Sequence, residues 1–495
     1  MLLKEFNMIK TLPKKLSQLF IIFLGSLFAC NPATSQVITP TTNVDVLPTT
    51  ISVSTSTPIP APSHNILELS SASEIPLPTY ERECINILRP KTTESEKTLQ
   101  DFSASGTAVF SEYVNDKDTI VLLDLATGKK HILPEDLTSS TWANSPDVSP
   151  DGKWLFYLTA KVDDLMGDAN FVLSNSEGVA IKTLSVSMVK YRGFSYQFVH
   201  QWLGNNSLRL LSKKDYRDDD LVVLLLNPFS EEIMQLQNDF EGLQPPVVKV
   251  ATSVRENPQY LDWGVDPFLD VILFQLHGAN VAYSPDKNLA FFPHEDGFDV
   301  LYDVTNQKEL AQLLISNWGE LPRWSTTGEN LSIIATPPNF SPDSAQKDFY
   351  LLSRDGKNLR RLTYLSEQFE RVSIKEYSWS PDGKKIAFWL NTNFPLFEEE
   401  KVPYELAVVD IASGNITNLC ITEPSVTAKE LAENAGYLVE PVWSQNSNDL
   451  LAEIHSVEQS MPDFYTETIL VIPSQLMALA MMKDAQLKGW MINEQ

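Results

Sequence analysis

Two acidic clusters are the side-chain groups in this sequence whose chemistry could hold a cation. The first contains Asp215, Asp218, Asp219 and Asp220, and the second contains Glu295, Asp296 and Asp299 beside His294. Calcium prefers carboxylate oxygens, but neither cluster has the ligand spacing of an EF-hand loop. Both clusters fall where loops between strands are expected, and Glu398-Glu399-Glu400 has the composition of a solvated loop. The sequence therefore predicts no metal site and no cofactor.

The short motifs of nucleophilic, metal-dependent and nucleotide-dependent catalysis are absent from the sequence. It contains no Gly-x-Ser-x-Gly, His-Glu-x-x-His, Cys-x-x-Cys or P-loop pattern. The histidines, among them His131, His200, His277, His294 and His455, are scattered singly. We therefore predict no catalytic residues. Carboxylates spaced across a channel would escape a motif search, so an enzyme remains an alternative.

A short turn motif returns along the chain and indicates a repeating architecture. Its clear copies are Val148-Ser149-Pro150-Asp151-Gly152, Tyr283-Ser284-Pro285-Asp286-Lys287 and Trp379-Ser380-Pro381-Asp382-Gly383. Weaker copies begin at Trp324 and Trp443. Proline sets the first turn position, aspartate bonds its own backbone, and glycine takes the left-handed conformation. Each copy therefore predicts a hairpin between two strands.

Apolar runs after the turns predict the strands themselves. The second strands are expected at 107–110, 154–158, 208–211, 289–292, 331–335, 385–390 and 450–454. Third strands ending in Thr-Gly, Ser-Gly or Asp-Gly turns are expected at 121–128, 349–356 and 408–414, and a fourth at 358–363. Four short strands in each of about seven units predict an all-β fold, a β-propeller of four-stranded antiparallel blades. The long interval between Trp202 and Ser284 leaves eight blades open, and six remain possible.

The repeat resembles that of known propeller families. Ser-Pro-Asp-Gly-Lys before an apolar strand, followed by an Asp-x-x-Thr/Ser-Gly turn, resembles the WD-repeat-like propeller repeat of TolB and the propeller half of prolyl oligopeptidases. The resemblance covers about residues 100 to 472. It implies the fold but not the function, since propellers host unrelated activities. Trp202, Trp324, Trp379 and Trp443 recur at one place in the repeat, where an aromatic side chain packs between blades or lines the channel.

The N-terminal region has the pattern of a secretory signal peptide. Lys4, Lys10, Lys14 and Lys15 precede an apolar run from Leu19 to Phe28. Leu27-Phe28-Ala29-Cys30 resembles the bacterial lipobox, which implies cleavage before Cys30 and lipidation of its sulfur, although Phe28 departs from the usual small residue. An ordinary signal with an unmodified Cys30 stays open, and translation could start at Met1 or Met8.

These features divide the chain into three parts. Residues 1–29 are expected to be a lipoprotein signal peptide, residues 30–65 a Thr/Ser/Pro-rich disordered tether, and residues 66–495 a single propeller domain. The stretch 31–63 is too polar to bury a core and carries one charge, Asp45. We predict a protein anchored to the outside of a bacterial cell membrane through lipid alone.

The charge of the chain limits the classes of partner it can bind, and its cysteine content bears on disulfide bonding. The chain has 38 basic and 64 acidic residues and a net charge of −26, which argues against nucleic acid and against docking flat on an anionic membrane. Of three cysteines, Cys84 and Cys420 remain once Cys30 is lipidated. In an oxidising compartment such a pair predicts a disulfide, the alternative being two buried thiols.

Together these observations predict a non-catalytic, membrane-anchored, extracytoplasmic propeller lipoprotein that binds a protein or peptide in the cell envelope. We expect a monomer whose binding residues the sequence does not identify. Two alternatives remain: an envelope polysaccharide-active glycosidase or lyase, and an accessory solute-binding subunit of a transporter. Two convergent carboxylates in the channel would favour the enzyme.

Overall fold

The computed structural model describes residues 66 to 493 with gaps. The gaps longer than five residues are 70–76, 90–98, 134–140, 162–167, 188–197, 214–220, 237–281, 394–400, 428–437 and 458–463. The chain divides into two compact units, 1–62 and 63–495, and all described residues belong to the second. The predicted signal peptide, Cys30 and the whole of the predicted tether lie outside the described residues.

The second unit contains seven sheets that each have a core of four antiparallel strands, here called blades 1 to 7. Blade 1 consists of β33 (Ala485–Met491), β4 (Thr107–Val114), β5 (Lys117–Asp124) and β6 (Lys130–Leu133). Blade 2 consists of β7 (Thr141–Val148), β8 (Leu155–Lys161), β9 (Asp168–Ser174) and β10 (Ala180–Ser187). Blade 3 consists of β11 (Phe198–Gly204), β12 (Ser207–Lys213), β13 (Leu221–Asn227) and β14 (Glu232–Leu236).

The remaining blades repeat this order. Blade 4 consists of β15 (Ala282–Tyr283), β16 (Leu289–Pro293), β17 (Asp299–Asp303) and β18 (Lys308–Leu314). Blade 5 consists of β19 (Arg323–Trp324), β20 (Asn330–Ala335), β21 (Asp348–Ser353) and β22 (Leu359–Arg361). Blade 6 consists of β23 (Ser373–Trp379), β24 (Lys385–Asn391), β26 (Glu405–Asp410) and β27 (Ile416–Thr422). Blade 7 consists of β29 (Val442–Trp443), β30 (Leu450–Val457), β31 (Phe464–Ile472) and β32 (Met477–Lys483).

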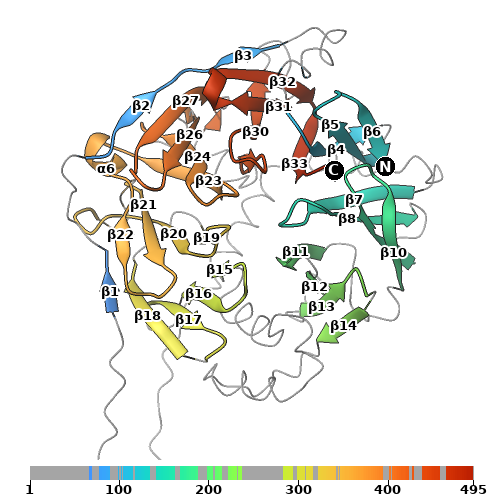
Figure 1. Cartoon of the computed structure of the whole chain (residues 1–495), viewed down its shortest axis with the longest axis horizontal. Coiled ribbons are helices and arrows are strands. Elements are labelled where there is room, and N and C mark those ends of the chain that lie inside the picture. The colour runs from blue at the N-terminus through green and yellow to red at the C-terminus, as the bar shows by residue number, and fades with distance from the viewer. Residues whose placement is uncertain are drawn as a thin grey trace, which may run out of the picture. The chain divides into compact units, whose positions relative to one another are not determined.

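Figure 1 shows these sheets arranged around a common centre, with the first strand of each blade innermost. The fold is a β-propeller. The described residues form seven blades, as the repeat count predicted, and the second strands expected from sequence lie in β4, β8, β12, β16, β20, β24 and β30. A two-stranded sheet, β25 (Lys401–Val402) with β28 (Val426–Thr427), and the short helix α6 (Leu365–Gln368) lie in loops.

The apolar core lies between neighbouring blades. Blades 6 and 7 share one cluster that includes Trp389 and Leu450, and blades 5 and 6 share another that includes Phe349 and Phe388. Strands covered on both faces need apolar side chains at successive positions, which explains why 385–390 shows no alternation. Each buried Leu, Ile or Phe in these strands contributes about 1.5–3 kcal/mol through removal of its surface from water.

The turn motif folds as a small hydrogen-bonded unit in blade 6. The Ser380 hydroxyl donates to the Asp382 carboxylate at 2.7 Å and accepts the Lys385 amide at 2.9 Å. The Asp382 carboxylate also accepts the Lys384 amide at 3.1 Å. Gly383 follows with φ of 69°, a left-handed conformation that favours glycine. The same serine hydroxyl bond recurs at Ser149–Asp151, Ser284–Asp286 and Ser444–Asn446.

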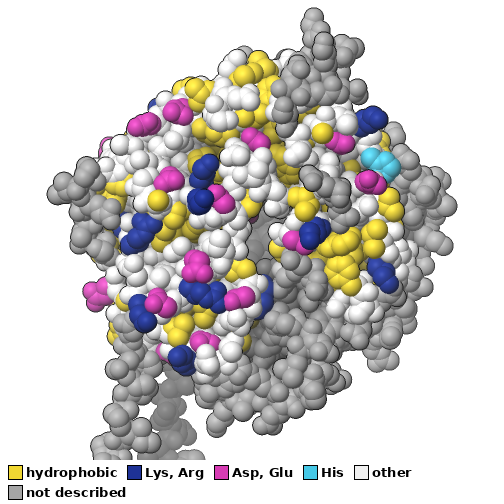
Figure 2. Space-filling view, in the orientation of Figure 1, with side chains coloured by type: hydrophobic (Ala, Val, Ile, Leu, Met, Phe, Trp, Pro, Cys, Tyr) yellow, Lys and Arg dark blue, Asp and Glu magenta, His cyan; other side chains and the backbone are white. Residues whose placement is uncertain are grey.

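These turns and those between the third and fourth strands lie at one end of the ring, because antiparallel neighbours alternate in direction. We call this the hairpin end. The remaining loops, which join the second strand to the third and each blade to the next, lie at the opposite end. Figure 2 shows one face of the ring, where acidic and basic side chains are interspersed over the blades.

The ring closes by pairing strands from the two ends of the described chain. The C-terminal strand β33 supplies the inner strand of blade 1 and pairs antiparallel with β4, Met491 lying opposite Thr107. This pairing explains why no turn motif precedes 107 in the sequence. Among the described residues, no helix has the length and hydropathy needed to cross a membrane.

An N-terminal strap, residues 66–89, adds a fifth strand to the outer edge of three blades. Its strands β1 (Ile66–Glu68), β2 (Tyr80–Arg82) and β3 (Asn86–Leu88) pair in parallel with β18, β27 and β32 of blades 4, 6 and 7. Ile85 is buried in the cluster shared by blades 6 and 7. Arg89 forms an ion pair with the buried Glu467 at 2.9 Å. Figure 1 shows the strap in blue along the rim.

Candidate functional site

The recurring tryptophans connect the inner strands of successive blades. The indole Nε1 of each donates to a backbone carbonyl in the inner strand of the preceding blade: Trp324 to Ala282 at 3.0 Å, Trp379 to Arg323 at 3.1 Å and Trp443 to Ser378 at 3.2 Å. All three side chains are buried. The packing interpretation of these aromatics is therefore correct, and they do not line an open channel.

Trp202 occupies the equivalent place in blade 3 but makes no such bond. It is buried and packs edge-on against Phe156 of blade 2, with ring centroids 6.4 Å apart. Its Nε1 has no hydrogen-bond partner within the part of the chain that the structure describes.

Two glutamates converge on one arginine at the inner strands of blades 5 to 7. Arg323 in β19 forms ion pairs with Glu440, which precedes β29, and with Glu376 in β23 at 3.4 Å. Its guanidinium also lies over the Tyr377 ring, 4.8 Å from the centroid. Glu376 occupies a bulge in β23 with φ of 29°, which places an extra residue in the strand.

The charges of this cluster compensate each other. Burial disfavours the charged form of Arg323, but the charges of Glu440 and Glu376 outweigh it and keep the pKa of the guanidinium raised. Arg323 of blade 5 thus contacts one glutamate from each of the next two blades. The two carboxylates are therefore brought together by an arginine, in an ion-pair clamp that links blades 5, 6 and 7.

Asp147 is a second polar group on an inner strand. It lies in β7 next to a bulge and is half-buried. Burial raises the pKa of its carboxyl to about 7, against the opposing charge of Lys488 in β33. A carboxyl with such a pKa exchanges protons near neutral pH.

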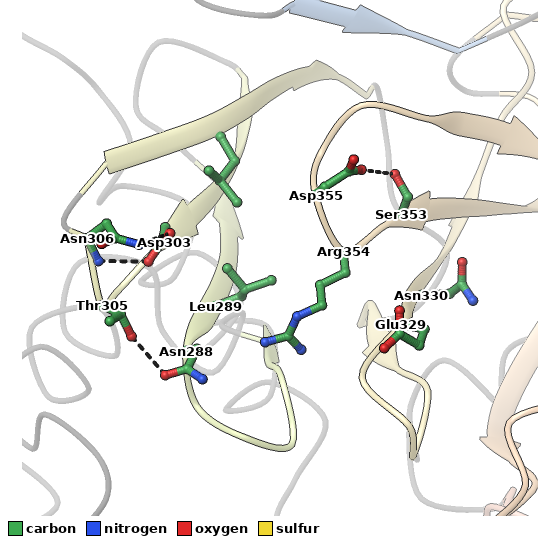
Figure 3. A pocket seen from close by; sticks show the side chains of 11 residues that line it. Asn288, Leu289, Asp303, Thr305, Asn306, Glu329, Asn330, Ser353, Arg354 and Asp355 are labelled. Atoms are coloured by element: carbon green, nitrogen blue, oxygen red, sulfur yellow. Dashed lines mark hydrogen bonds between the residues drawn. The ribbon is translucent and has the colours of Figure 1, made fainter.

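A pocket of about 750 Å³ opens at the hairpin end between blades 4 and 5. Figure 3 shows the side chains that line it, which come from both turns of each blade. Blade 4 contributes Asn288, Leu289, Asp303, Thr305, Asn306 and Leu310. Blade 5 contributes Glu329, Asn330, Ser353, Arg354 and Asp355.

Arg354 crosses this pocket and ties the two blades together. It forms an ion pair with Asp286 of the blade 4 turn motif and donates to the Gly328 carbonyl at 3.1 Å. Partial burial favours the neutral acid, but hydrogen bonds from Ser284, Arg354 and Asn288 outweigh it and lower the pKa of Asp286 to about 2. Among the described residues that line this pocket, the one basic side chain is thus already compensated.

The carboxylates of the pocket are less well compensated. Asp303 accepts hydrogen bonds from the backbone and side-chain amides of Asn306, both at 2.8 Å. Asp355 accepts from Ser353 and lies 3.4 Å from the Lys357 ammonium. Glu329 is exposed and forms no ion pair with another described residue. The pocket is therefore acidic and suits a cationic group.

The structure brings together one pair of residues predicted from sequence. Cys84 and Cys420 form a disulfide with Cα atoms 4.7 Å apart. Cys30, the cluster Asp215–Asp220, Glu295, Asp296 and the run 398–400 lie outside the residues whose side chains the structure describes. Asp299 is buried in β17. Within the described segments, no group of three or more His, Cys, Asp or Glu side chains is placed to hold a metal ion.

Comparison with known proteins adds a likeness in fold. TolB from Agrobacterium tumefaciens aligns at 12% identity over 69% of this chain and 96% of its own, with a TM-score of 0.33. An oligogalacturonate lyase in complex with manganese aligns at 13% identity over 76% and 88%, with a TM-score of 0.41. The propeller domain of Swd1 from Myceliophteria thermophila aligns at 12% identity over 70% and 93%, with a TM-score of 0.37. No protein-family model and no curated protein matches the sequence. At this distance the likeness extends to the fold alone.

Sequence reasoning did not find the pocket or the arginine cluster. Asp286 was identified as a turn residue, but its partner Arg354 belongs to another blade. Glu376 and Glu440 each stand three positions before a recurring tryptophan, Trp379 and Trp443. That shared offset was the one signal available in the sequence.

Proposed function

We propose that this propeller is a non-catalytic binding protein of the bacterial envelope that takes a basic side chain of a protein or peptide partner into the pocket between blades 4 and 5. The observation that carries this proposal is the exposed carboxylate of Glu329, which forms no ion pair with another described residue, beside an arginine that is already paired. A lysine or arginine of a partner would complete the charge balance of the pocket. Lipid on Cys30 would hold the domain at the membrane surface.

The hairpin end is suited to this role because its turns are already ordered. The serine and aspartate side chains of the turn motif bond the backbone beside them, as in Ser284 and Asp286. A surface that is ordered before binding loses little conformational entropy when the partner docks. The clamp of Arg323 on Glu376 and Glu440 adds to this order, since it links blades 5, 6 and 7.

The test is cross-linking in intact envelopes followed by capture of the full chain, with wild type compared against Glu329→Lys. Charge reversal in the pocket should reduce the captured partner by about tenfold, which corresponds to about 1.4 kcal/mol. The matched control is Glu370→Lys, the same charge change at an exposed residue of the opposite end. Equal capture by wild type and Glu329→Lys would refute the proposal, and so would equal loss in both variants.

A second candidate is the polysaccharide-active enzyme, which one observation favours. The pKa of Asp147 is raised to about 7, a value suited to a general acid or base. If this candidate is correct, the protein should release new reducing ends or unsaturated sugars from envelope polysaccharide, and Asp147→Asn should abolish the release. Failure of the wild-type protein to release any sugar would eliminate it.

A further inference from the structure

A second pocket, of about 700 Å³, lies at the hairpin end between blades 1 and 2. Its walls are the β5–β6 hairpin of blade 1, the β9–β10 hairpin of blade 2 and Asn493 after β33. It therefore occupies the place between blades 1 and 2 that the acidic pocket occupies between blades 4 and 5. The two pockets differ in the charge of their walls.

Two lysines and two carboxylates line this second pocket, so its formal charges balance. Lys129 and Lys130 are exposed and form no ion pair with any other described residue. Two acidic side chains share the lining. The Asp124 carboxylate caps its own turn, accepting the amides of Ala126 at 2.8 Å and Thr127 at 3.1 Å. The Glu177 carboxylate is exposed on the β9–β10 turn and forms no ion pair with another described residue.

Neutral donors complete the wall on the side of blade 2. The side-chain carbonyl of Asn175 accepts the amides of Glu177 at 3.1 Å and Val179 at 2.9 Å. These bonds fix the orientation of the side chain and leave its amide nitrogen available as a donor. Ser176 is buried beside it and adds a hydroxyl to the same lining.

The His131 imidazole lies in the space that a side chain at position 178 would need, and this position is a glycine. A Cβ added to Gly178, which has φ of 79°, would lie 2.8 Å from His131 Cδ2 and 3.1 Å from Nε2. Real Cβ atoms essentially never lie within 3.0 Å of a neighbour, so a side chain at this position would displace the ring or the turn. The imidazole thus forms part of the wall between the two hairpins.

We infer that this pocket is an anion site that binds a carboxylate or phosphate group through the ammonium groups of Lys129 and Lys130, with Asn175 and Ser176 as neutral donors. Charged donors of this kind form the strongest hydrogen bonds to oxyanions. The inference does not depend on the proposed partner of the acidic pocket, because it concerns different residues. An acidic segment of a protein and a small organic acid or phosphate offer the same chemistry.

The experiment is acetylation footprinting of the lysines in the full chain, measured by mass spectrometry at constant ionic strength. The probes are inorganic phosphate, succinate and a tetraglutamate peptide. An anion in the pocket should slow acetylation of Lys129 and Lys130 by about threefold at millimolar concentration, since a bound ligand protects its site in proportion to occupancy. Lys153 and Lys357, which lie outside the pocket, serve as internal controls.

Two variants make the result specific to the site. Ser176→Ala should weaken the protection, and Glu177→Gln should strengthen it by removing the competing carboxylate. Protection by phosphate or succinate alone identifies a small ligand, and protection by the peptide at a much lower concentration identifies an acidic protein segment. Slowing that is equal at Lys153 and Lys357, or no slowing by any probe, would overturn the inference.

Discussion

Cys84 and Cys420 lie with their Cα atoms 4.7 Å apart across a sequence separation of 336 residues. Cys84 belongs to the connection between β2 and β3 of the strap, and Cys420 lies in β27 at the outer edge of blade 6. The disulfide predicted from sequence is therefore present. It fastens the strap where it passes from blade 6 to blade 7, whereas strand β33 closes the ring.

The first prediction concerns this disulfide. Protein from residue 31 onward, unfolded without reductant, should show no free thiol. Replacing both cysteines with serine should lower the free energy of unfolding by about 2–4 kcal/mol, because the unfolded chain regains conformational freedom. Denaturant titration of both proteins measures the loss. Two titratable thiols in the unreduced wild type would contradict the pairing.

The second prediction concerns the left-handed turn residue of blade 6. Gly383→Val should destabilise the domain by about 1–3 kcal/mol, since φ of 69° is strongly disfavoured for a β-branched residue. An added Cβ would also lie 3.1 Å from Thr327 Cγ2 of blade 5. Thermal unfolding measures the effect, and an unchanged melting temperature would show that the turn is wrongly assigned.

The same motif offers a control of opposite sign. Lys287 holds the glycine place of the blade 4 turn with φ of 60°. Lys287→Gly should therefore be neutral or stabilise by up to about 1 kcal/mol, because the release of strain exceeds the entropy cost of glycine.

The third prediction concerns the ion pair of Asp286 with Arg354 between blades 4 and 5, whose contribution to stability should depend on pH. The pKa of Asp286 is lowered to about 2 in the folded protein, so its contribution to stability is complete above its usual pKa of 3.8 and is lost as pH falls towards 2. Arg354→Gln should cost about 1 kcal/mol at pH 7, a value reduced for solvent screening of a partly exposed pair. The difference in melting temperature from wild type should shrink as the pH falls below 4.

Arg360→Gln is the matched control for this measurement. Arg360 donates to the Ile411 carbonyl at 2.5 Å and pairs with no carboxylate in the described structure. The loss of stability caused by Arg360→Gln should therefore be independent of pH between 7 and 3. If Arg354→Gln behaved in the same pH-independent way, the ion pair with Asp286 would not be the source of the stabilisation.

The fourth prediction concerns Asp147, whose effect on stability changes with pH in the opposite direction to that of Asp286. The pKa of Asp147 is raised from 3.8 to about 7, so this group favours the folded state below pH 4 and its contribution is lost as pH rises through 7. Asp147→Asn should match wild type near pH 4 and be more stable by about 1–2 kcal/mol at pH 8, because solvent reaches the half-buried side chain. Denaturant titrations at the two pH values measure this, and a gain of equal size at both would contradict it.

The fifth prediction concerns the anchor. Cells fed an alkyne fatty acid should incorporate it into this protein, and Cys30→Ala should abolish the label and release the protein from membranes. Cys84→Ser is the control and should keep the label. A Cys30→Ala protein that remains labelled would refute lipidation.

The repeat was predictable because its turn chemistry is local. Ser380, Pro381, Asp382 and Gly383 interact with one another and with the next two residues, so a short window of sequence contains all the information. The runs 385–390 and 331–335 were equally clear, since burial on both faces requires continuous apolar residues.

The strap and the two sites were not predictable, because their interactions join residues that are distant in sequence. Strand β2 has three residues, of which Glu81 and Arg82 are charged, and only the edge of β27 makes it a strand. Arg323, Glu376 and Glu440 belong to three different blades, and the ion pair of Arg354 with Asp286 joins two. Such contacts depend on how blades pack, which no local pattern encodes.

The pairing of β33 with β4 also constrains the order in which the chain can fold. Trp490 donates to the carbonyl of Ser105, 385 residues earlier in the sequence. The first blade to be synthesised therefore lacks its inner strand until synthesis has reached the last described strand, and the strap meets its edges on blades 4, 6 and 7 almost as late. Contacts so distant in sequence make folding slow, and the open edge of β4 is exposed to mispairing in the meantime. We therefore expect this chain to complete its fold only after β33 has been synthesised, and to be prone to aggregation during that interval.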